Sequence, residues 1–141
     1  MFSSEQLIEL SANLKALMGP ICRSHNLSFA QFLILSNIPS SGVSLKKISY
    51  VVGSEISTMS RNIDKLIAHG LISKTKSLRD KRKVNILRRN KAISLLKAIN
   101  KDIKSKTISL DFEAYDGKSL TFLKNALEQF SWVCYKHLHE K

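Results

Sequence analysis

The sequence has only two cysteines, Cys22 and Cys134, and they lie far apart in the chain. Because no Cys-x-x-Cys pair is present, the sequence lacks the spacing of a zinc finger or of a thioredoxin-like redox motif. In a reducing compartment each cysteine is most simply a small, buried apolar residue. A redox-sensing role for Cys22 is the less favoured alternative.

Long hydrophobic runs are also absent. No stretch of about eighteen apolar residues occurs, so no membrane-spanning helix is expected. The first residues, MFSSEQ, have neither the basic region nor the apolar region of a signal peptide. The sequence therefore predicts a cytoplasmic protein without a membrane partner.

Motifs of catalysis and cofactor binding are missing as well. The sequence has no glycine-rich phosphate loop, no Gly-x-Ser-x-Gly and no His-Glu-x-x-His. His137 and His139 are two residues apart, which points them to different faces of a helix and disfavours a metal site. We therefore predict a protein that is not an enzyme and that binds no metal and no cofactor.

The charge of the chain is large and unevenly distributed. The 141 residues are 43% apolar, which is enough for a single domain with a buried core. Of the formal charge of +12, the excess lies in residues 46–110, which hold seventeen basic and four acidic side chains. Such a patch favours a polyanionic partner, because neutralising phosphates releases condensed counterions. A membrane surface is the weaker alternative, since the basic segment lacks the Trp-, Phe- and Leu-rich face of an interfacial helix.

The stretch from residue 51 to residue 71 has the pattern of one amphipathic helix. Ser54 stands at an N-cap position and Gly70 at a C′ position, which predicts a helix over about 54–69. The residues of its apolar stripe recur at intervals of three and four: Ile56, Met59, Ile63, Leu66 and Ile67. The residues outside the stripe carry hydroxyls and cations that suit phosphates and base edges: Ser54, Ser57, Thr58, Ser60, Arg61 and Lys65. We predict a recognition helix for the major groove of double-stranded DNA, although this segment alone would equally fit a solvated amphipathic helix.

The residues that follow Gly70 favour the recognition helix over a solvated amphipathic helix. Two β-like runs, 71–77 and 83–87, enclose a charged tip. A winged helix-turn-helix has this order of elements: a helix, a glycine, a strand, a basic tip and a second strand. The wing, about 71–87, is predicted to reach the minor groove, where Arg82 would insert. Asp80 would order the tip by accepting hydrogen bonds, while Arg79, Lys81 and Lys83 would contact phosphates or remain solvated.

The residues before the recognition helix predict two further helices. Ser28 and Gln31 form a capping-box pattern, and Pro39 requires that helix to end near Ile38. Ser44 is predicted to cap the next helix, and Gly53 to permit the tight turn that follows it. The predicted DNA-binding lobe therefore spans about residues 28–88 of a single domain, 1–141.

Four runs resemble the MarR family of bacterial transcription regulators: LSFAQFLIL at 27–35, SLKKIS at 44–49, STMSRNIDKLIAHGLI at 57–72 and the wing tip Asp80-Lys81-Arg82. The resemblance implies a mostly α fold with a small β-wing, in which N- and C-terminal dimerisation helices flank a winged helix-turn-helix core. It also implies a homodimeric, sequence-specific DNA-binding transcriptional repressor, and the ordering role of the aspartate in an Asp-x-Arg tip.

The sequence departs from the family pattern at two places. The family usually has a Leu-Thr pair, followed shortly by Gly, at the start of the helix after the wing. Here Leu87 is followed by Arg88, so Asn90 is predicted to cap that helix instead. Ser54 stands where the family more often has an apolar residue.

Both ends of the chain carry apolar residues at the three- and four-residue spacing of paired helices. The N-terminal residues of this kind are Leu7, Leu10, Leu14 and Leu17, and the C-terminal ones are Leu120, Leu123, Leu127 and Phe130. Gly19-Pro20 predicts a kink or stop near Met18. A helix over about 90–108 is predicted from Ile93, Leu96, Ile99 and Ile103. Because little else remains to cover these residues, regions 4–24 and 90–139 are predicted to form a symmetric homodimer.

A small-molecule effector is a further hypothesis. In the resembled family a small anionic or phenolic ligand often binds between the dimer helices and the DNA-binding lobe. Arg23, His25, Phe29 and Phe32 could line such a pocket here. Aromatic side chains that simply pack in the core, beside a surface arginine, are the simpler alternative.

Two other functions remain open. A low-specificity nucleic-acid-binding protein, such as an architectural protein, would also use a strongly basic surface. A winged-helix module could instead present its basic face to an acidic protein. A footprint with defined half-site spacing would favour the specific regulator, uniform affinity the architectural protein, and absence of DNA binding the interaction module.

Overall fold

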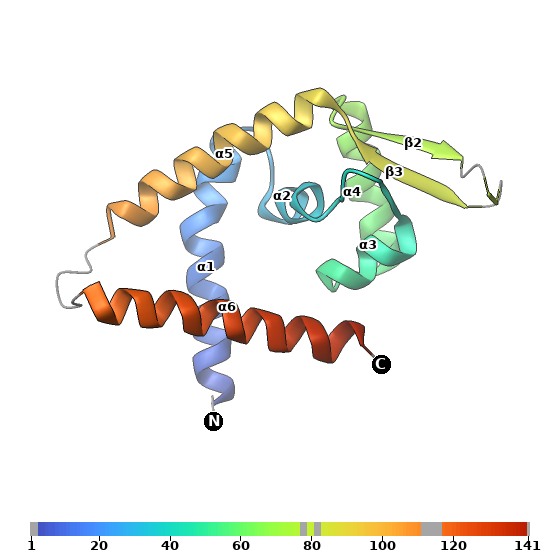
Figure 1. Cartoon of the computed structure of the whole chain (residues 1–141). Coiled ribbons are helices and arrows are strands. Elements are labelled where there is room, and N and C mark those ends of the chain that lie inside the picture. Colours follow the sequence, from blue (N-terminus) through green and yellow to red (C-terminus); the bar gives the residue numbers. More distant parts are fainter. Residues whose placement is uncertain (1–2, 77–78, 81–82, 111–116, 141) are drawn as a thin grey trace. The chain divides into compact units, whose positions relative to one another are not determined.

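The computed structural model describes residues 3–76, 79–80, 83–110 and 117–140 (Figure 1). The chain forms two compact units, Met1–Ser105 and Lys106–Lys141. The described residues form six helices and a three-stranded sheet, so the predicted mostly α fold with a small β-sheet is confirmed.

Helix α1 spans Ser4–Ser24, which are the bounds predicted for the N-terminal helical region. It begins with a capping box, in which the Ser3 hydroxyl accepts from the amide of Gln6 and the Gln6 side chain accepts from the amide of Ser3. The predicted stop near Met18 is wrong, because the helix continues through Pro20. Pro20 lies on the exposed side of α1, where water can bond the carbonyl that lost its amide partner.

The next two helices begin and end where local chemistry predicted. Helix α2, Phe29–Ser36, carries the expected capping box between Ser28 and Gln31. Helix α3, Leu45–Val52, is capped by the Ser44 hydroxyl, which accepts from the amide of Lys47. Gly53 has a φ of 65°, and this left-handed conformation turns the chain out of α3 as expected.

The wing follows helix α4, Ile56–Ala68, and consists of strands β2, Ile72–Lys76, and β3, Val84–Arg88. A two-residue strand, β1, Val43–Ser44, pairs with the other edge of β3, so the antiparallel sheet has the order β1-β3-β2. In Figure 1 the β2–β3 hairpin extends away from α4.

Helix α5, Asn90–Ile108, is separated from β3 by the single residue Arg89. The expectation that Asn90 would be its N-cap is wrong, because Asn90 is already the first helical residue. The end of α1 contacts α5, since His25 Nε2 lies 2.7 Å from Asp102 Oδ2. Helix α6, Gly117–His139, belongs to the second unit.

One hydrophobic core holds the first unit together. Its buried side chains come from α1 to α5, the turns between them and the sheet: Cys22, Leu27, Phe32, Ile34, Leu35, Ile38, Val43, Ile48, Met59, Ile63, Leu66, Leu71, Ile72, Ile86, Ala92, Leu96 and Ile99. On α5, Ala92, Leu96 and Ile99 are buried, whereas Ile93 is 41% exposed.

The two cysteines lie in different environments. Cys22 is fully buried, as predicted, whereas the same prediction for Cys134 is wrong, since its side chain is exposed on α6. Burial raises the pKa of the Cys22 thiol, and a backbone hydrogen bond and the Arg23 cation offset only part of that effect. The buried thiol is therefore poor in thiolate, the reactive form.

Substituting Gly42 should test the packing of β1 against β3. Gly42 has a φ of 85°, and an added Cβ would overlap the Asn85 side-chain amide, which donates to the carbonyl of Ser41. Gly42→Ala should therefore lower the free energy of unfolding by about 2–3 kcal/mol, from left-handed strain and a lost hydrogen bond. Gly53→Ala, which has open space, is the control and should cost about 1 kcal/mol. Urea denaturation measures both, and equal losses would contradict this account.

Thiol reactivity should separate the two cysteines. In the folded protein at about pH 8, iodoacetamide should modify Cys134 and leave Cys22 unmodified, because the Cys22 thiol is buried and its pKa is raised. Both should react in guanidinium. Mass spectrometry of the alkylated chain measures this, with Cys134→Ser as the control. Rapid labelling of folded Cys134→Ser would show that Cys22 is accessible.

Candidate nucleic-acid interface

The start of α4 differs from the prediction. Its N-cap is Glu55, which makes no side-chain capping bond, and the helix begins at Ile56. The predicted N-cap role of Ser54 is therefore wrong. The amide of Ser54 donates to the carbonyl of Ser49, so Ser54 closes the end of α3. Its hydroxyl lies 3.4 Å from the carbonyl oxygen of Glu55.

The end of α4 matches the prediction. Gly70 has a φ of 71°, and the amide of Leu71 donates to the carbonyl of Leu66, which is the bond of a Schellman-type helix end. The carbonyl of His69 accepts a hydrogen bond of 2.8 Å from Nζ of Lys91 on α5. A cation at this position also suits the negative end of the helix dipole.

The apolar stripe anchors α4 over most of its length. Met59, Ile63 and Leu66 are fully buried, and Ile67 is half-buried. Ile56 is the exception, because its side chain is 54% exposed. The predicted burial of Ile56 is therefore wrong, since the helix starts at this residue and the core begins one turn later.

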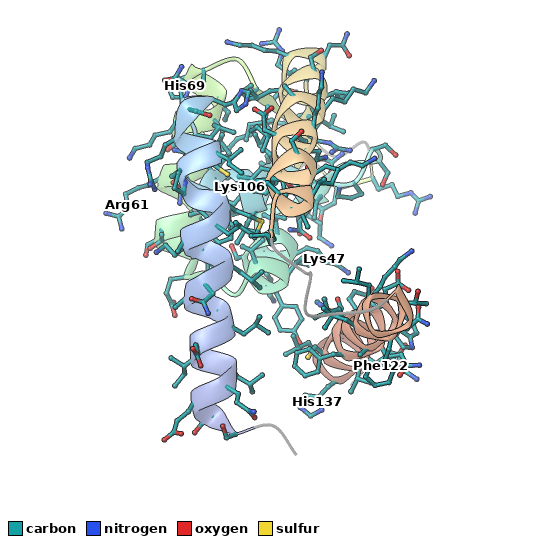
Figure 2. All side chains as sticks on the ribbon, turned by 90° about the vertical axis from the view of Figure 1, so that its left-hand side faces the viewer. Lys47, Arg61, His69, Lys106, Phe122 and His137 are labelled. Atoms are coloured by element: carbon teal, nitrogen blue, oxygen red, sulfur yellow. The ribbon has the colours of Figure 1, made fainter. Side chains whose placement is uncertain are left out.

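The polar side chains of α4 lie together on its outer surface. Ser57, Thr58, Arg61 and Lys65 are exposed, and Ser60 is half-buried. Figure 2 shows Arg61 projecting outward from the first unit. Sequence reasoning missed one acidic neighbour, Asp64, whose Oδ1 lies 3.5 Å from Nζ of Lys74 on β2. This contact links the exposed side of α4 to the wing.

At the wing tip the structure describes Arg79, which is exposed, and Asp80, which is half-buried. Lys81 and Arg82 lie outside the described residues. The carbonyl of Asp80 accepts a hydrogen bond of 2.9 Å from the amide of Lys83. The tip-ordering role of the Asp80 carboxylate stays a prediction.

The wing also gathers several cations, of which the sequence did not single out Lys76. A cleft of about 450 Å³ lies on the sheet and is lined by Ser44, Thr75, Lys76, Arg79, Lys83, Val84 and Asn85. It brings Lys76 beside the predicted residues Arg79 and Lys83. Lys76 pairs with Val84, the residue after Lys83, so this grouping is recognisable only once the register of the two strands is known.

A second cleft lies between α3 and the start of α4. It has a volume of about 520 Å³ and is lined by Ser44, Lys46, Lys47, Ser49, Tyr50, Ser54 and Ile56. Lys46 and Lys47 are exposed on α3. The two clefts, the outer side of α4 and the wing therefore form one region rich in cations and hydroxyls, which suits a nucleic-acid backbone.

The residues predicted for dimerisation lie on α1 and α6. Leu7, Leu10 and Leu14 of α1 are exposed and Leu17 is half-buried. On α6, Leu120, Leu123 and Leu127 are exposed and Phe130 is half-buried. Contiguous exposed apolar residues on a helix are typical of an interaction surface.

The four candidate ligand residues divide between two environments. Phe32 is buried and Phe29 half-buried, and their rings pack with centroids 6.5 Å apart. Arg23 is exposed, whereas His25 pairs with Asp102. Of the four, only His25 lines the cleft of about 780 Å³ formed by Ser24, His25, Asn26, Leu27, His69, Leu71, Lys91, Ser94 and Leu95. The effector pocket stays a prediction.

Among the described residues, no group of three or more His, Cys, Asp or Glu side chains could hold a metal ion. No helix in the described part of the chain is long and apolar enough to cross a membrane.

Comparison with known proteins gives a family and a fold. Residues 16–99 match the family described as transcriptional regulator SarA/Rot. None of the curated proteins matches the chain.

Three solved structures illustrate the fold. MarR from Peptoclostridium difficile is 20% identical, with a TM-score of 0.75, over 99% of this chain and 96% of that one. A mutant MarR from E. coli, complexed with operator DNA, is 16% identical, with a TM-score of 0.68, over 89% and 91%. CouR from Rhodococcus jostii, bound to p-coumaroyl-CoA, is 14% identical, with a TM-score of 0.75, over 96% and 90%. The winged helix-turn-helix fold is thereby confirmed.

Proposed function

Since the family match covers more than half of the chain, the chain belongs to the SarA/Rot family of transcriptional regulators, and we propose that it is a homodimeric, sequence-specific transcriptional repressor. It is a DNA-binding regulator with the MarR fold, and such regulators are not enzymes. The proposal adds the mode of binding, the homodimer and the direction of regulation.

The outer side of α4 carries the proposal. Hydroxyls at Ser57 and Thr58 and the cation of Arg61 are exposed on a helix whose other side is buried. We place this side in the major groove, where Arg61 reads a base edge and Lys65 contacts phosphate. The wing lies in the adjoining minor groove, with Arg79, Lys81 and Arg82 near the backbone or inside the groove.

The same observations support separate DNA-binding and dimerisation regions along the chain. Residues 28–88 form the DNA-binding lobe, and residues 4–24 and 90–139 form the dimerisation region. The exposed leucines of α1 and α6 support this division, because a second copy would remove them from water. Cytoplasmic residence and double-stranded DNA as partner accord with this role.

The structure that holds p-coumaroyl-CoA supports a small-molecule effector for this chain as well. A ligand that binds one conformation of the dimer better than another would shift its affinity for DNA. The alternative function, low-specificity nucleic-acid binding, uses the same basic surface and differs in predicting equal affinity for all sequences.

Replacing Arg61 should test sequence-specific reading. Arg61→Ala should weaken binding to a selected operator by about 1–3 kcal/mol and weaken binding to random DNA less, because a bidentate contact with a guanine edge is lost. Fluorescence anisotropy at one fixed salt concentration measures both affinities. The control is Lys97→Ala, which removes an exposed cation from α5 and should leave their ratio unchanged. Equal losses on both DNAs would make Arg61 a phosphate contact.

Charging α6 should test the homodimer. The double variant Leu123→Asp and Leu127→Asp should destabilise the dimer by several kcal/mol, because two carboxylates would be buried at the interface. Sedimentation velocity at micromolar concentration should then show a monomer. The control, Asn125→Asp with Gln129→Glu, adds the same charge at exposed positions of the same helix. A leucine variant that stays dimeric would exclude this interface.

A further inference from the structure

The recognition helix begins with a large apolar side chain in contact with solvent. Ile56 is the first residue of α4 and is 54% exposed, although its spacing from Met59 and Ile63 places it in line with the buried stripe. Leaving an isoleucine half in water forgoes much of the stabilisation that its burial would give. The core therefore does not explain this residue.

The surroundings of Ile56 are those of a DNA-binding surface. It shares its cleft with Lys46 and Lys47 of α3, and Ser57 and Thr58 follow it on the exposed side of α4. Because cations border this apolar side chain on one side and hydroxyls on the other, its surface complements a polyanion.

Glu55, the residue before Ile56, indicates which part of the DNA lies next to Ile56, a base edge or a phosphate. Glu55 is exposed, occupies the N-cap of α4 and makes no side-chain capping bond. A carboxylate is favourable beside the positive end of a helix, but it opposes a phosphate at the same place. The tip of α4 thus suits the edges of bases, and phosphates suit the lysines farther away.

We infer that Ile56 contacts the C5-methyl group of a thymine and makes the protein selective for thymine at that position of its operator. Residues at the N-terminal end of a recognition helix contact base edges, and the thymine methyl is the apolar group that the major groove displays. This inference rests on the proposed function, because it requires α4 to lie in the major groove.

Deoxyuridine allows a direct test, since it differs from thymidine only by the absence of this methyl group. An operator would be selected from random duplexes, and each dT would then be replaced singly by dU. Affinities would be measured for the wild type, for Ile56→Ala and for Ile93→Ala, which removes another exposed isoleucine, from α5. Circular dichroism would check folding, and Ile56→Val, which keeps a branched apolar group, provides a milder variant.

At one dT in each half-site, loss of the methyl should weaken wild-type binding about fourfold, which corresponds to one buried methyl-sized group. Ile56→Ala should bind the unmodified operator at least about fourfold more weakly and should be insensitive to dU at that same position. Ile56→Val should retain most of the sensitivity, and Ile93→Ala all of it.

Three outcomes would overturn the inference. If Ile56→Ala binds as the wild type does, Ile56 lies outside the DNA interface. A second outcome is that, at every dT, the loss of affinity for Ile56→Ala on the dU operator equals the product of the separate fold-losses from Ile56→Ala and from dU. In that case no thymine methyl touches Ile56. If the wild type binds selected and scrambled duplexes equally, the proposed function itself fails before any variant is made. The first two outcomes leave sequence-specific binding intact, so the two failures are distinguishable.

Discussion

The burial of three side chains on the inner side of α4 determines how the rest of the interface is presented. Met59, Ile63 and Leu66 are fully buried in the core. Each such side chain contributes about 1.5–3 kcal/mol when removed from water, so their combined burial resists any rotation of the helix. Because successive residues are about 100° apart around the axis, turning α4 by one residue would expose this set and bury polar groups. The outward direction of Arg61 is therefore a consequence of the core.

The sequence predicted those parts of the fold that depend on bonds between near neighbours. The caps at Ser28 and Ser44 and the left-handed turns at Gly53 and Gly70 were predicted correctly, because each needs only residues within about one helical turn. The cap at Ser54 failed because α4 begins at Ile56, which places Glu55 and not Ser54 at the N-cap. Periodicity failed at the ends of stripes, as at Ile56, since spacing shows which residues share a side but not how far the core extends.

The sequence predicted which residues of α4 would face outward, but it did not predict the contacts that these elements make with distant parts of the chain. The exposed polar residues of α4 follow from helix periodicity alone. The pairing of Asp64 with Lys74, and that of His25 with Asp102 across 77 residues, depend on how distant segments pack. Likewise, Lys76 and Lys83 join Arg79 only through the register of two strands. Charge density along the chain indicated where a polyanion would bind, but not which cations would share one cleft.

Ser44 links the two DNA-facing elements in a way that limits how the lobe can move. As a strand residue it pairs with Asn85 of β3, and as the N-cap of α3 it accepts from the amide of Lys47. No hinge of even one residue therefore separates the wing sheet from the helix-turn-helix. In the proposed binding mode the wing sheet and the helix-turn-helix would therefore move as one body, and a poorly matched groove would have to deform to fit them. The stiffness of the DNA would then contribute to which sites are chosen.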